Sequence, residues 1–450
     1  MKRPEHKPPS RARLRKHLNA DALIAAVRSE CEKLPDPRNG SAKIPVADVA
    51  MSAFAMFSLK DPSLLAFEKR WTARDHNLHC LYRIETIPAD TTMREVLDDI
   101  SPMELRPAFR AIFRQLQRGK VLEEMTVWDG HCLLALDGTG YFSSEKLQSE
   151  SCLQKTDSRT GKTTYYLQMM GAALVHPDFK EVLPLAPEPI CREDGTTKND
   201  CERNAAKRFL EKLRAEHPHL KLIVTEDALS PNAPHVELLQ RLDFRYILGV
   251  KPGDHAFLFE KVDEAAANGQ AVEFAYPDPD NPDKLHYFRF VNDLPLNKSH
   301  PDIRVNFLEY WQATSKGNIS FSWVTDIVIT RENAYPLMRA GRARWKIENE
   351  TFNTLKNQGY NLEHNYGLAK KHLSTVFVTI MMLALLVDQV QQLCCPLFRA
   401  AWKKLQSKRD LWERMRALFY DFQLKSMQMI YEALLYGYKR PVPEITYDST

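Results

Sequence analysis

The sequence lacks the cysteine pattern of a disulfide framework or of a structural zinc site. Its eight cysteines are scattered through 450 residues, with Cys394 and Cys395 adjacent and no CxxC pair. His76, His79 and Cys80 lie close together, but no second pair of ligands has zinc-finger spacing, so we interpret them as structural. This cysteine usage favours a reducing, cytoplasmic compartment.

A membrane-spanning run is also missing. The most apolar stretch, Val376 to Val387, is 12 residues long, short of the ~20 residues that cross a bilayer. It therefore predicts a buried core helix, and no membrane partner is expected. The first residues are basic and rich in proline without an apolar stretch behind them, so no signal peptide is expected either.

Neither sign of charge dominates the chain, whose net charge is only +4. The basic residues are nevertheless clustered, since the first 17 residues hold seven Lys or Arg and one acid, and residues 399–425 hold eight basic and three acidic side chains. Such clusters suit a polyanion, because each cation near a phosphate displaces condensed counterions. A solvated tail and a solvated helix face would give the same pattern, so charge alone leaves both interpretations open.

Several familiar catalytic motifs are absent as well. The segment SRTGKTTYY contains GKT, but Thr156 stands where a phosphate loop needs its first glycine. This segment runs into a strand rather than a helix, so a hairpin turn is the better interpretation. DGTGYFSS lacks the third glycine of a dinucleotide fingerprint, and the chain has no GxSxG and no HExxH.

The chain does contain a regular order of helices and strands. Residues 18 to about 120 show helical spacing, and the segments behind them are short, apolar and rich in β-formers. The order of three strands, helix, strand, helix and strand predicts an α/β fold, a mixed sheet flanked by helices. The expected strands are 131–144, 163–176, 180–190, 220–227 and 244–253, and the expected helices are 199–219, capped by Asn199 or Asp200, and 234–242.

Residues 251 to about 330 break this order. Segments 285–293, 303–314 and 319–330 alternate as antiparallel strands do, with a Pro- and Asp-rich link before them. We interpret this part as a β-rich insertion. A helix with the sequence RARWKIENETF follows it, and helices continue to about residue 438.

Two aspartates follow apolar strand segments. Asp137 closes the run CLLALDG, and Asp227 closes LKLIVTED. A carboxylate there costs free energy unless it is paired or binds a cation, and strand ends are where such sheets place ligands. Each aspartate alone is more often a turn residue at the end of a strand than a ligand, but two of them after strands of one sheet favour a ligand site. Asp129 and Glu226 are rivals, but Asp129 precedes its strand, and Glu226 would point away from Asp227 because side chains alternate along a strand.

The helix after the insertion offers two glutamates on different faces. With 3.6 residues per turn, Glu348 shares a face with Trp345 and Phe352, while Glu350 shares a face with Lys346. Glu350 is therefore expected on the wet face with a cation partner, and Glu348 on the apolar face that packs inward. A carboxylate there needs a partner, either Arg344 one turn earlier or a metal ion. A buried pair of Arg344 and Glu348 is the competing structural explanation.

Three carboxylates without a histidine or cysteine cluster favour Mg²⁺ or Mn²⁺ over zinc. Two such ions held by shared carboxylates are a known apparatus for attack on a phosphodiester. The candidate ligands are Asp137, Asp227 and Glu348.

Four segments together resemble bacterial insertion-sequence DDE transposases, in particular the group sometimes written "IS-four-like". They are LALDGTGYFSS, NDCERNAAKRFL, LIVTEDALSPNAPH before YILGVKPGDH, and RARWKIENETFNTLKNQGYNLEHNYG, within roughly residues 127–373. The resemblance implies a ribonuclease-H-like catalytic core with a β-rich insertion before the last catalytic helix. It also implies cut-and-paste transposition with two Mg²⁺ ions, for which Mn²⁺ could substitute.

The resemblance places the first and second catalytic aspartates on Asp137 and Asp227. The family signature of the last helix is Tyr, two residues, Arg, three residues, Glu, six residues, Lys, which places Arg344 and Glu348 at the Arg and Glu positions. The Tyr position is Gly341, and the lysine comes one residue late, at Lys356. The resemblance implies contacts of Arg344 and Lys356 with DNA phosphates.

The resemblance also implies the organisation and the partners. The partners are double-stranded DNA, as terminal inverted repeats and as target, and a second copy of the chain in the DNA complex, in the cytoplasm at a bacterial nucleoid. A ribonuclease-H-like nuclease or recombinase that does not join strands, and a DNA-binding protein with a decayed site, are the alternatives. The expected parts are a helical DNA-binding region (1–120), the first part of the core (121–250), the insertion (251–330), the last part of the core (331–375) and a C-terminal helical region (376–450).

Overall fold

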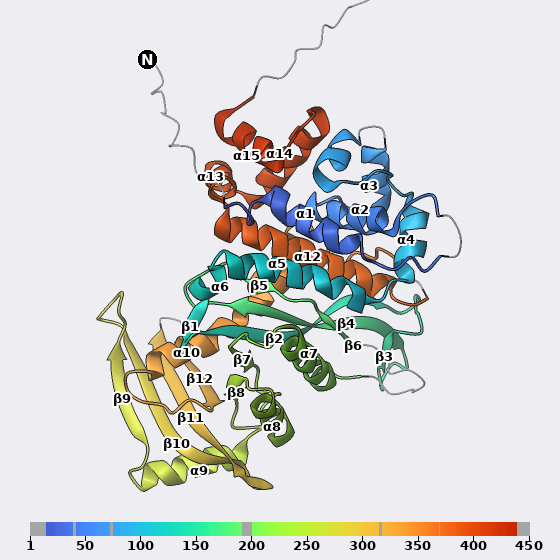
Figure 1. The fold of residues 1–450 in the computed structure, drawn as a ribbon. Coiled ribbons are helices and arrows are strands. Elements are labelled where there is room, and N and C mark those ends of the chain that lie inside the picture. The colour runs from blue at the N-terminus through green and yellow to red at the C-terminus, as the bar shows by residue number, and fades with distance from the viewer. Residues whose placement is uncertain are drawn as a thin grey trace, which may run out of the picture.

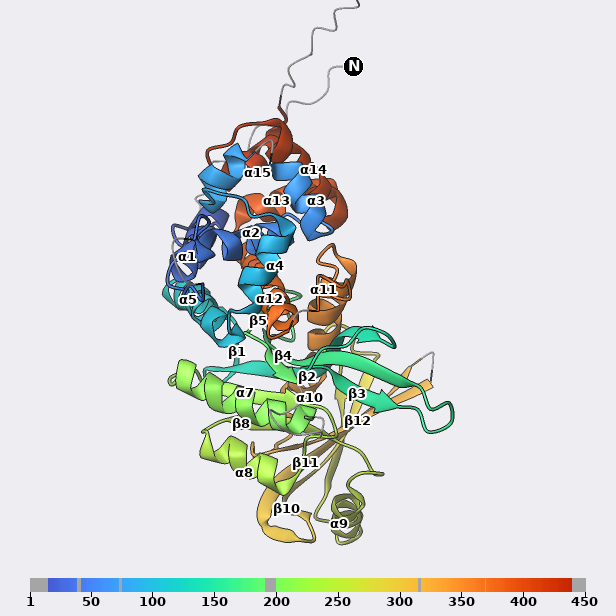
Figure 2. The same ribbon diagram turned by 90° about the vertical axis from the view of Figure 1, so that its right-hand side faces the viewer.

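A computed structural model describes residues 15–38, 42–72, 75–190, 200–314, 317–368 and 370–438. The basic residues 1–14 and the predicted cap Asn199 lie outside these ranges. The described chain forms one central sheet with helices on both faces (Figures 1 and 2). A helical body lies over one face, and two helices cover the other.

Helices from both ends of the chain make up this helical body. The first helices pack against the long helix α12, so regions distant in sequence share one core (Figure 1). The N-terminal part supplies α1 (Ala20–Cys31), α2 (Val46–Ser58), α3 (Leu64–Trp71), η1 (Leu78–Tyr82), α4 (Asp90–Asp98), η2 (Pro102–Leu105), α5 (Arg106–Arg118) and α6 (Val121–Glu124), and the C-terminal part supplies α12 (Leu373–Cys394), α13 (Pro396–Leu405), α14 (Lys408–Asp421) and α15 (Met427–Tyr436).

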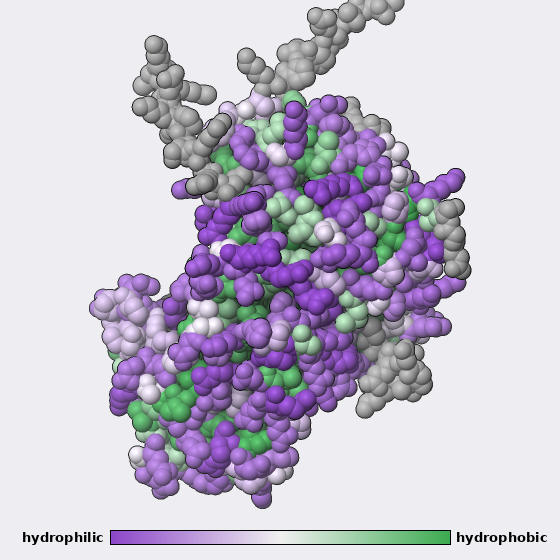
Figure 3. Space-filling model, in the orientation of Figure 1, coloured by the Kyte–Doolittle hydropathy of each residue, from purple (hydrophilic) through white to green (hydrophobic). Residues whose placement is uncertain are grey.

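The predicted core helix is α12. By length and composition it could cross a membrane, but 89% of its most apolar window is buried inside the protein. Its apolar side chains pack on the helical body and on the sheet, as in the core helix of a soluble protein. The face drawn in Figure 3 is hydrophilic over most of its area, with apolar side chains only in small patches. The prediction of a buried helix is confirmed.

The sheet has the strand order of a ribonuclease-H-like core. Strands β2, β4 and the short β6 are antiparallel neighbours, and β7 and β8 then continue in parallel beside β2. A β3–β4 hairpin forms where the sequence predicted a turn. The bounds are β1 (Thr126–Trp128), β2 (His131–Ser144), β3 (Leu153–Thr156), β4 (Thr163–Val175), β5 (Leu183–Pro184), β6 (Glu188–Ile190), β7 (Leu222–Glu226) and β8 (Arg245–Val250).

The β-rich segment continues the same sheet. Its last strand, β12 (Gly317–Thr325), pairs antiparallel with β8, and β11 (His300–Thr314), β10 (Leu285–Asn297) and β9 (Val272–Pro277) follow outward. The three predicted strands are therefore confirmed. Helix α9 (Ala256–Ala267) precedes them and was not predicted.

Two helices cover the other face of the sheet, α7 (Glu202–Glu216) and α8 (Ala233–Arg241), as Figure 2 shows. The predicted cap of α7 is wrong, because Cys201 is the N-cap and its side chain accepts no hydrogen bond. Asp200 instead accepts a hydrogen bond of 2.7 Å from Arg208, eight residues later. The charged hydrogen bond with Arg208 thus takes the place of the predicted capping hydrogen bond.

The helix predicted after the β-rich segment is not continuous. It consists of α10 (Ala334–Arg342), a 3₁₀ turn η3 (Ala343–Trp345), a π turn η4 (Ile347–Phe352) and α11 (Asn353–Asn357). Each change of hydrogen-bond spacing changes the rotation per residue. The faces of this segment therefore differ from those of a regular α-helix.

Candidate active site

Asp137 and Asp227 lie on or just after neighbouring parallel strands. In the register of β2 and β7, the last pair is Ala135 with Thr225. Asp227 directly follows β7, and it lines the same cavity as Asp137. The expectation that Asp137 ends its strand is wrong, because β2 runs on to Ser144 in pairing with β4. It is the parallel partner β7 that ends, and this exposes the edge at which both aspartates stand.

Arg344 joins Asp137 to Glu348. One guanidinium nitrogen donates to Asp137 Oδ2 at 2.9 Å and the other donates to Glu348 Oε1 at 2.9 Å. Arg344 and Asp137, which are 207 positions apart in the sequence, are thus in direct contact. Phe352, at the end of η4, packs on Gly171 of β4, where an added Cβ would lie 2.5 Å from the ring. Because Gly171 pairs with Asp137, η4 and the Asp137 side chain lie on the same face of the sheet.

The surroundings of Asp137 disfavour its charge. Burial raises the pKa of this carboxyl group from 3.8 to about 6, the guanidinium of Arg344 lowers it in part, and the charge of Glu348 raises it. Burial alone would lower the pKa of the Arg344 guanidinium, but Asp137 and Glu348 outweigh this effect and raise it. A half-buried carboxylate of this kind is stabilised by any further cation that reaches it.

The predicted faces of the two glutamates are wrong. The Glu348 side chain is 52% exposed, and Trp345, which was expected on the same inward face, is exposed as well. Lys346 is buried instead, and its ammonium donates to the carbonyls of His176 and Pro177, so Glu350 is half-buried beside it. The 3₁₀ and π turns cause the difference, because they rotate the chain by other angles than the 100° of an α-helix.

Gly341 and Lys356, the two positions that differ from the signature considered in the sequence, have separate structural surroundings. At Gly341 an added Cβ would lie 2.6 Å from the indole of Trp323 on β12, so a larger residue there has no room. The π turn takes about one residue more than an α turn. This shift places Leu355 in the core and leaves Lys356 partly exposed, in an ion pair of 2.8 Å with Glu363. Among the described residues, no recorded contact joins Lys356 to the three carboxylates.

A cavity of about 210 Å³ opens at the edge of the sheet beside the two aspartates. Glu202 of α7 lines it as well, and burial together with the charge of Asp227 raises the pKa of that carboxyl group. Glu226 pairs with His235 at 2.6 Å. Burial opposes the charge of His235, but Glu226 outweighs it and raises its pKa. Glu226 and Asp129 were the alternatives to the two predicted aspartate ligands. Glu226 is ion-paired with His235, and Asp129 lies in the turn at the opposite end of β2.

Within the described ranges, no group of three His, Cys, Asp or Glu side chains is placed closely enough to hold a metal ion. Asp137 and Glu348 are instead gathered about the guanidinium of Arg344, while Asp227 shares the cavity with Asp137. The chemistry of the three side chains fits a hard divalent cation, since all the donor atoms are carboxylate oxygens. Two of these carboxylates, Asp137 and Glu348, already bind the positively charged guanidinium of Arg344. The sequence missed Glu202, because nothing in a helix pattern shows which strand its first turn faces.

No protein-family model and no curated protein matches this sequence. Among solved structures, the chain is similar to a piggyBac transposase determined by cryo-electron microscopy as a synaptic complex with hairpin DNA. The identity is 11%, the similarity covers 97% of this chain and 88% of that chain, and the TM-score is 0.41.

Proposed function

We propose that this protein is a DNA transposase that cuts phosphodiester bonds at the ends of an insertion sequence and joins the freed 3′-hydroxyls to target DNA. The observation that supports this proposal is the position of Asp137 relative to the other two carboxylates. Asp137 lines a cavity together with Asp227, and it shares the guanidinium of Arg344 with Glu348. Carboxylates at the open edge of a ribonuclease-H-like sheet suit metal-assisted attack on a phosphodiester.

Asp137, Asp227 and Glu348 would hold two Mg²⁺ ions, which when bound activate the attacking water and stabilise the leaving oxygen. Arg344 holds Asp137 and Glu348 near each other and limits their repulsion. With the carboxylates neutralised by bound ions, the guanidinium would be free to bind a DNA phosphate. The protein then contributes chiefly positioning and charge. Lys356, on the far side of the π turn, is proposed as a second phosphate contact.

The helical body is proposed to bind the terminal repeats of the element. Because helices from both chain ends pack together, the predicted N-terminal and C-terminal DNA-binding regions would act as one surface. Two ends must be brought together for transposition, so we propose a homodimer in the DNA complex and a location at the nucleoid of a bacterial cytoplasm.

Cleavage assays with two glutamate variants test the assignment of the third ligand. Purified protein is incubated with Mg²⁺ and with DNA from either side of its coding sequence. Wild type is expected to cut at the element ends. Glu348→Gln is expected to lower the rate by more than about 100-fold, because a metal ligand is lost. Glu350→Gln, a matched change two residues away, is expected to keep most of the activity.

The products distinguish the alternatives. Cleavage without joined products would indicate a nuclease that does not transfer strands. Binding without cleavage by wild type would indicate a decayed site. Loss of activity in Glu350→Gln but not in Glu348→Gln would show that the third ligand is assigned to the wrong glutamate.

A further inference from the structure

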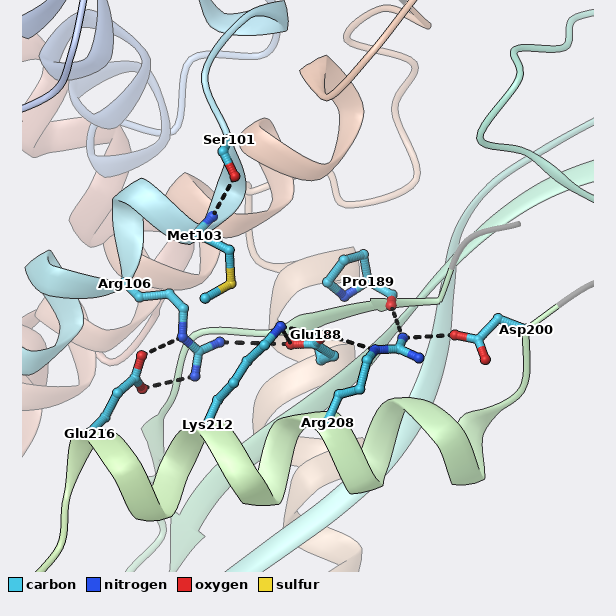
Figure 4. A network of polar contacts seen from close by, with 9 residues as sticks. All are labelled: Ser101, Met103, Arg106, Glu188, Pro189, Asp200, Arg208, Lys212 and Glu216. Carbon is cyan, nitrogen blue, oxygen red and sulfur yellow. Dashed lines mark hydrogen bonds and ion pairs between the residues drawn. The ribbon is translucent and has the colours of Figure 1, made fainter. Parts of the chain in front are cut away.

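Helix α7 carries five Lys and Arg residues, and three of them are engaged by the fold. Arg208 donates to Glu188 and Asp200, and Lys212 donates to both carboxylate oxygens of Glu188 (Figure 4). In the same network Arg106 of α5 is paired with Glu216 at 2.6 Å. Arg214 donates to four backbone carbonyls, those of Leu242, Pro218, Leu220 and Asp243.

The other two cations, Arg203 and Lys207, are exposed and form no ion pair or hydrogen bond with any described residue. They are four residues apart, so they share one face of α7. Both line the 210 Å³ cavity together with Asp137 and Asp227. The free cations of α7 thus lie at this cavity near the edge of the sheet, on the face opposite to η4.

Helix stability does not explain these two residues. Like charges four residues apart repel each other, and cations near the N-terminus oppose the helix dipole. Glu211, which could pair with Lys207 one turn later, is paired with Arg241 at 2.8 Å. Neither the helix dipole nor pairing within α7 therefore stabilises these two cations, and a bound anion would.

We propose that Arg203 and Lys207 bind phosphates two steps apart on the DNA strand that reaches Asp137 and Asp227 at the edge of the sheet. This inference rests on the proposed function of the site. Four residues of helix rise about 6 Å, which is close to two phosphate steps of 3.4 Å along one strand of a duplex. The two side chains are DNA-positioning residues, and the carboxylates remain the catalytic ones.

The test measures DNA binding apart from cleavage. Arg203→Gln, Lys207→Gln and the double variant are made in the full chain carrying Glu348→Gln, without metal. Binding to a labelled duplex of random sequence is followed by fluorescence anisotropy at several salt concentrations. The double variant is expected to bind about tenfold or more weakly, and its plot of log K against log salt is expected to be shallower by about 1.8, or 0.9 for each lost phosphate contact.

Lys284→Gln, in the same Glu348→Gln chain, is the matched control. It removes one positive charge from the tip of the β9–β10 hairpin, outside the cavity, and is expected to leave the salt dependence unchanged. The Tm of the Arg203 and Lys207 variants is expected to stay the same or rise. Unchanged binding, or weaker binding accompanied by a fall in Tm, would overturn the proposal. If wild type binds DNA but does not cut it, the proposed function is wrong, whereas the effect of Arg203 and Lys207 on DNA binding is still tested by the variants.

Discussion

Asp137 is the residue at which stability and function conflict. Its pKa rises from 3.8 to about 6 in the folded protein, chiefly because of burial. The folded state therefore binds this proton more tightly than the unfolded state. The contribution to the free energy of unfolding is fully present below about pH 4 and is lost as the pH rises through about 6. At neutral pH the ionised carboxylate costs stability and is ready for a cation.

Asp137→Asn is expected to be more stable than wild type near pH 7, and the gain should vanish near pH 4. The difference is at most about 3 kcal/mol, because one unit of pKa corresponds to about 1.4 kcal/mol. Urea denaturation of both proteins at several pH values measures it. A wild-type protein that gains stability relative to the variant between pH 4 and pH 7 would show that the carboxylate is paired favourably. Mg²⁺ should raise the Tm of wild type alone, because a ligand stabilises the state that binds it.

Among the elements, the π turn η4 decides where Glu348 stands. Phe352 fixes this turn on β4 by packing over Gly171, which has no side chain to obstruct it. A π turn inside a helical segment is frequently found at functional sites. The position of Glu348 thus depends on the packing of the Phe352 ring over Gly171.

Gly171→Ala is expected to destabilise the protein by about 1–3 kcal/mol, because the new methyl group overlaps the Phe352 ring. Cleavage should fall as well, since η4 must shift and carry Glu348 with it. Gly140→Ala is the control on β2, where the nearest atom would be 3.8 Å away, and it should cost less than about 1 kcal/mol. Combining Gly171→Ala with Phe352→Leu should restore part of the activity. If Gly171→Ala matches the control in stability and cleavage, Phe352 does not position Glu348.

In the whole molecule, one buried ion pair joins the two ends of the chain. The ammonium of Lys60, after α2, lies 2.5 Å from Asp388 of α12, and both side chains are at most 2% exposed. The hydroxyl of Tyr360 also donates to Asp388. Tyr360 lies in the segment that follows α11. The same pair therefore connects the helical body to the chain that leaves the candidate active site.

Lys60→Met is expected to lower the free energy of unfolding by about 3–5 kcal/mol, because it leaves the charge of Asp388 buried without its cation. The matched control is Lys371→Met, whose ion pair with Asp99 also joins distant parts of the chain but is exposed. That change should cost less than about 1 kcal/mol. Denaturant unfolding of the two variants gives the comparison. Similar losses of unfolding free energy would show that the buried pair contributes no more to stability than the exposed one.

Local pattern predicted most of the backbone. The alternation and bounds of β2, β4, β10 and β11 are set by short-range preferences that a sequence displays directly. The neighbouring positions of Asp137 and Asp227 follow from the strand order. The sequence did not predict helix α9, because this helix lies in a segment of β-rich character. It also gave the wrong cap for α7, because Asp200 is bound by Arg208, eight residues further along the chain.

The sequence by itself determined the fold class, the carboxylates and their resemblance to a family. Only the tertiary structure decided that Glu348 faces outward, that Arg344 bridges it to Asp137, and that Trp323 fills the space beside Gly341. The physical reason is that periodicity describes one regular helix, whereas η3 and η4 change the rotation for the sake of packing against β4. Which cations of α7 remain free was likewise settled by partners far away in the chain, which no local pattern contains.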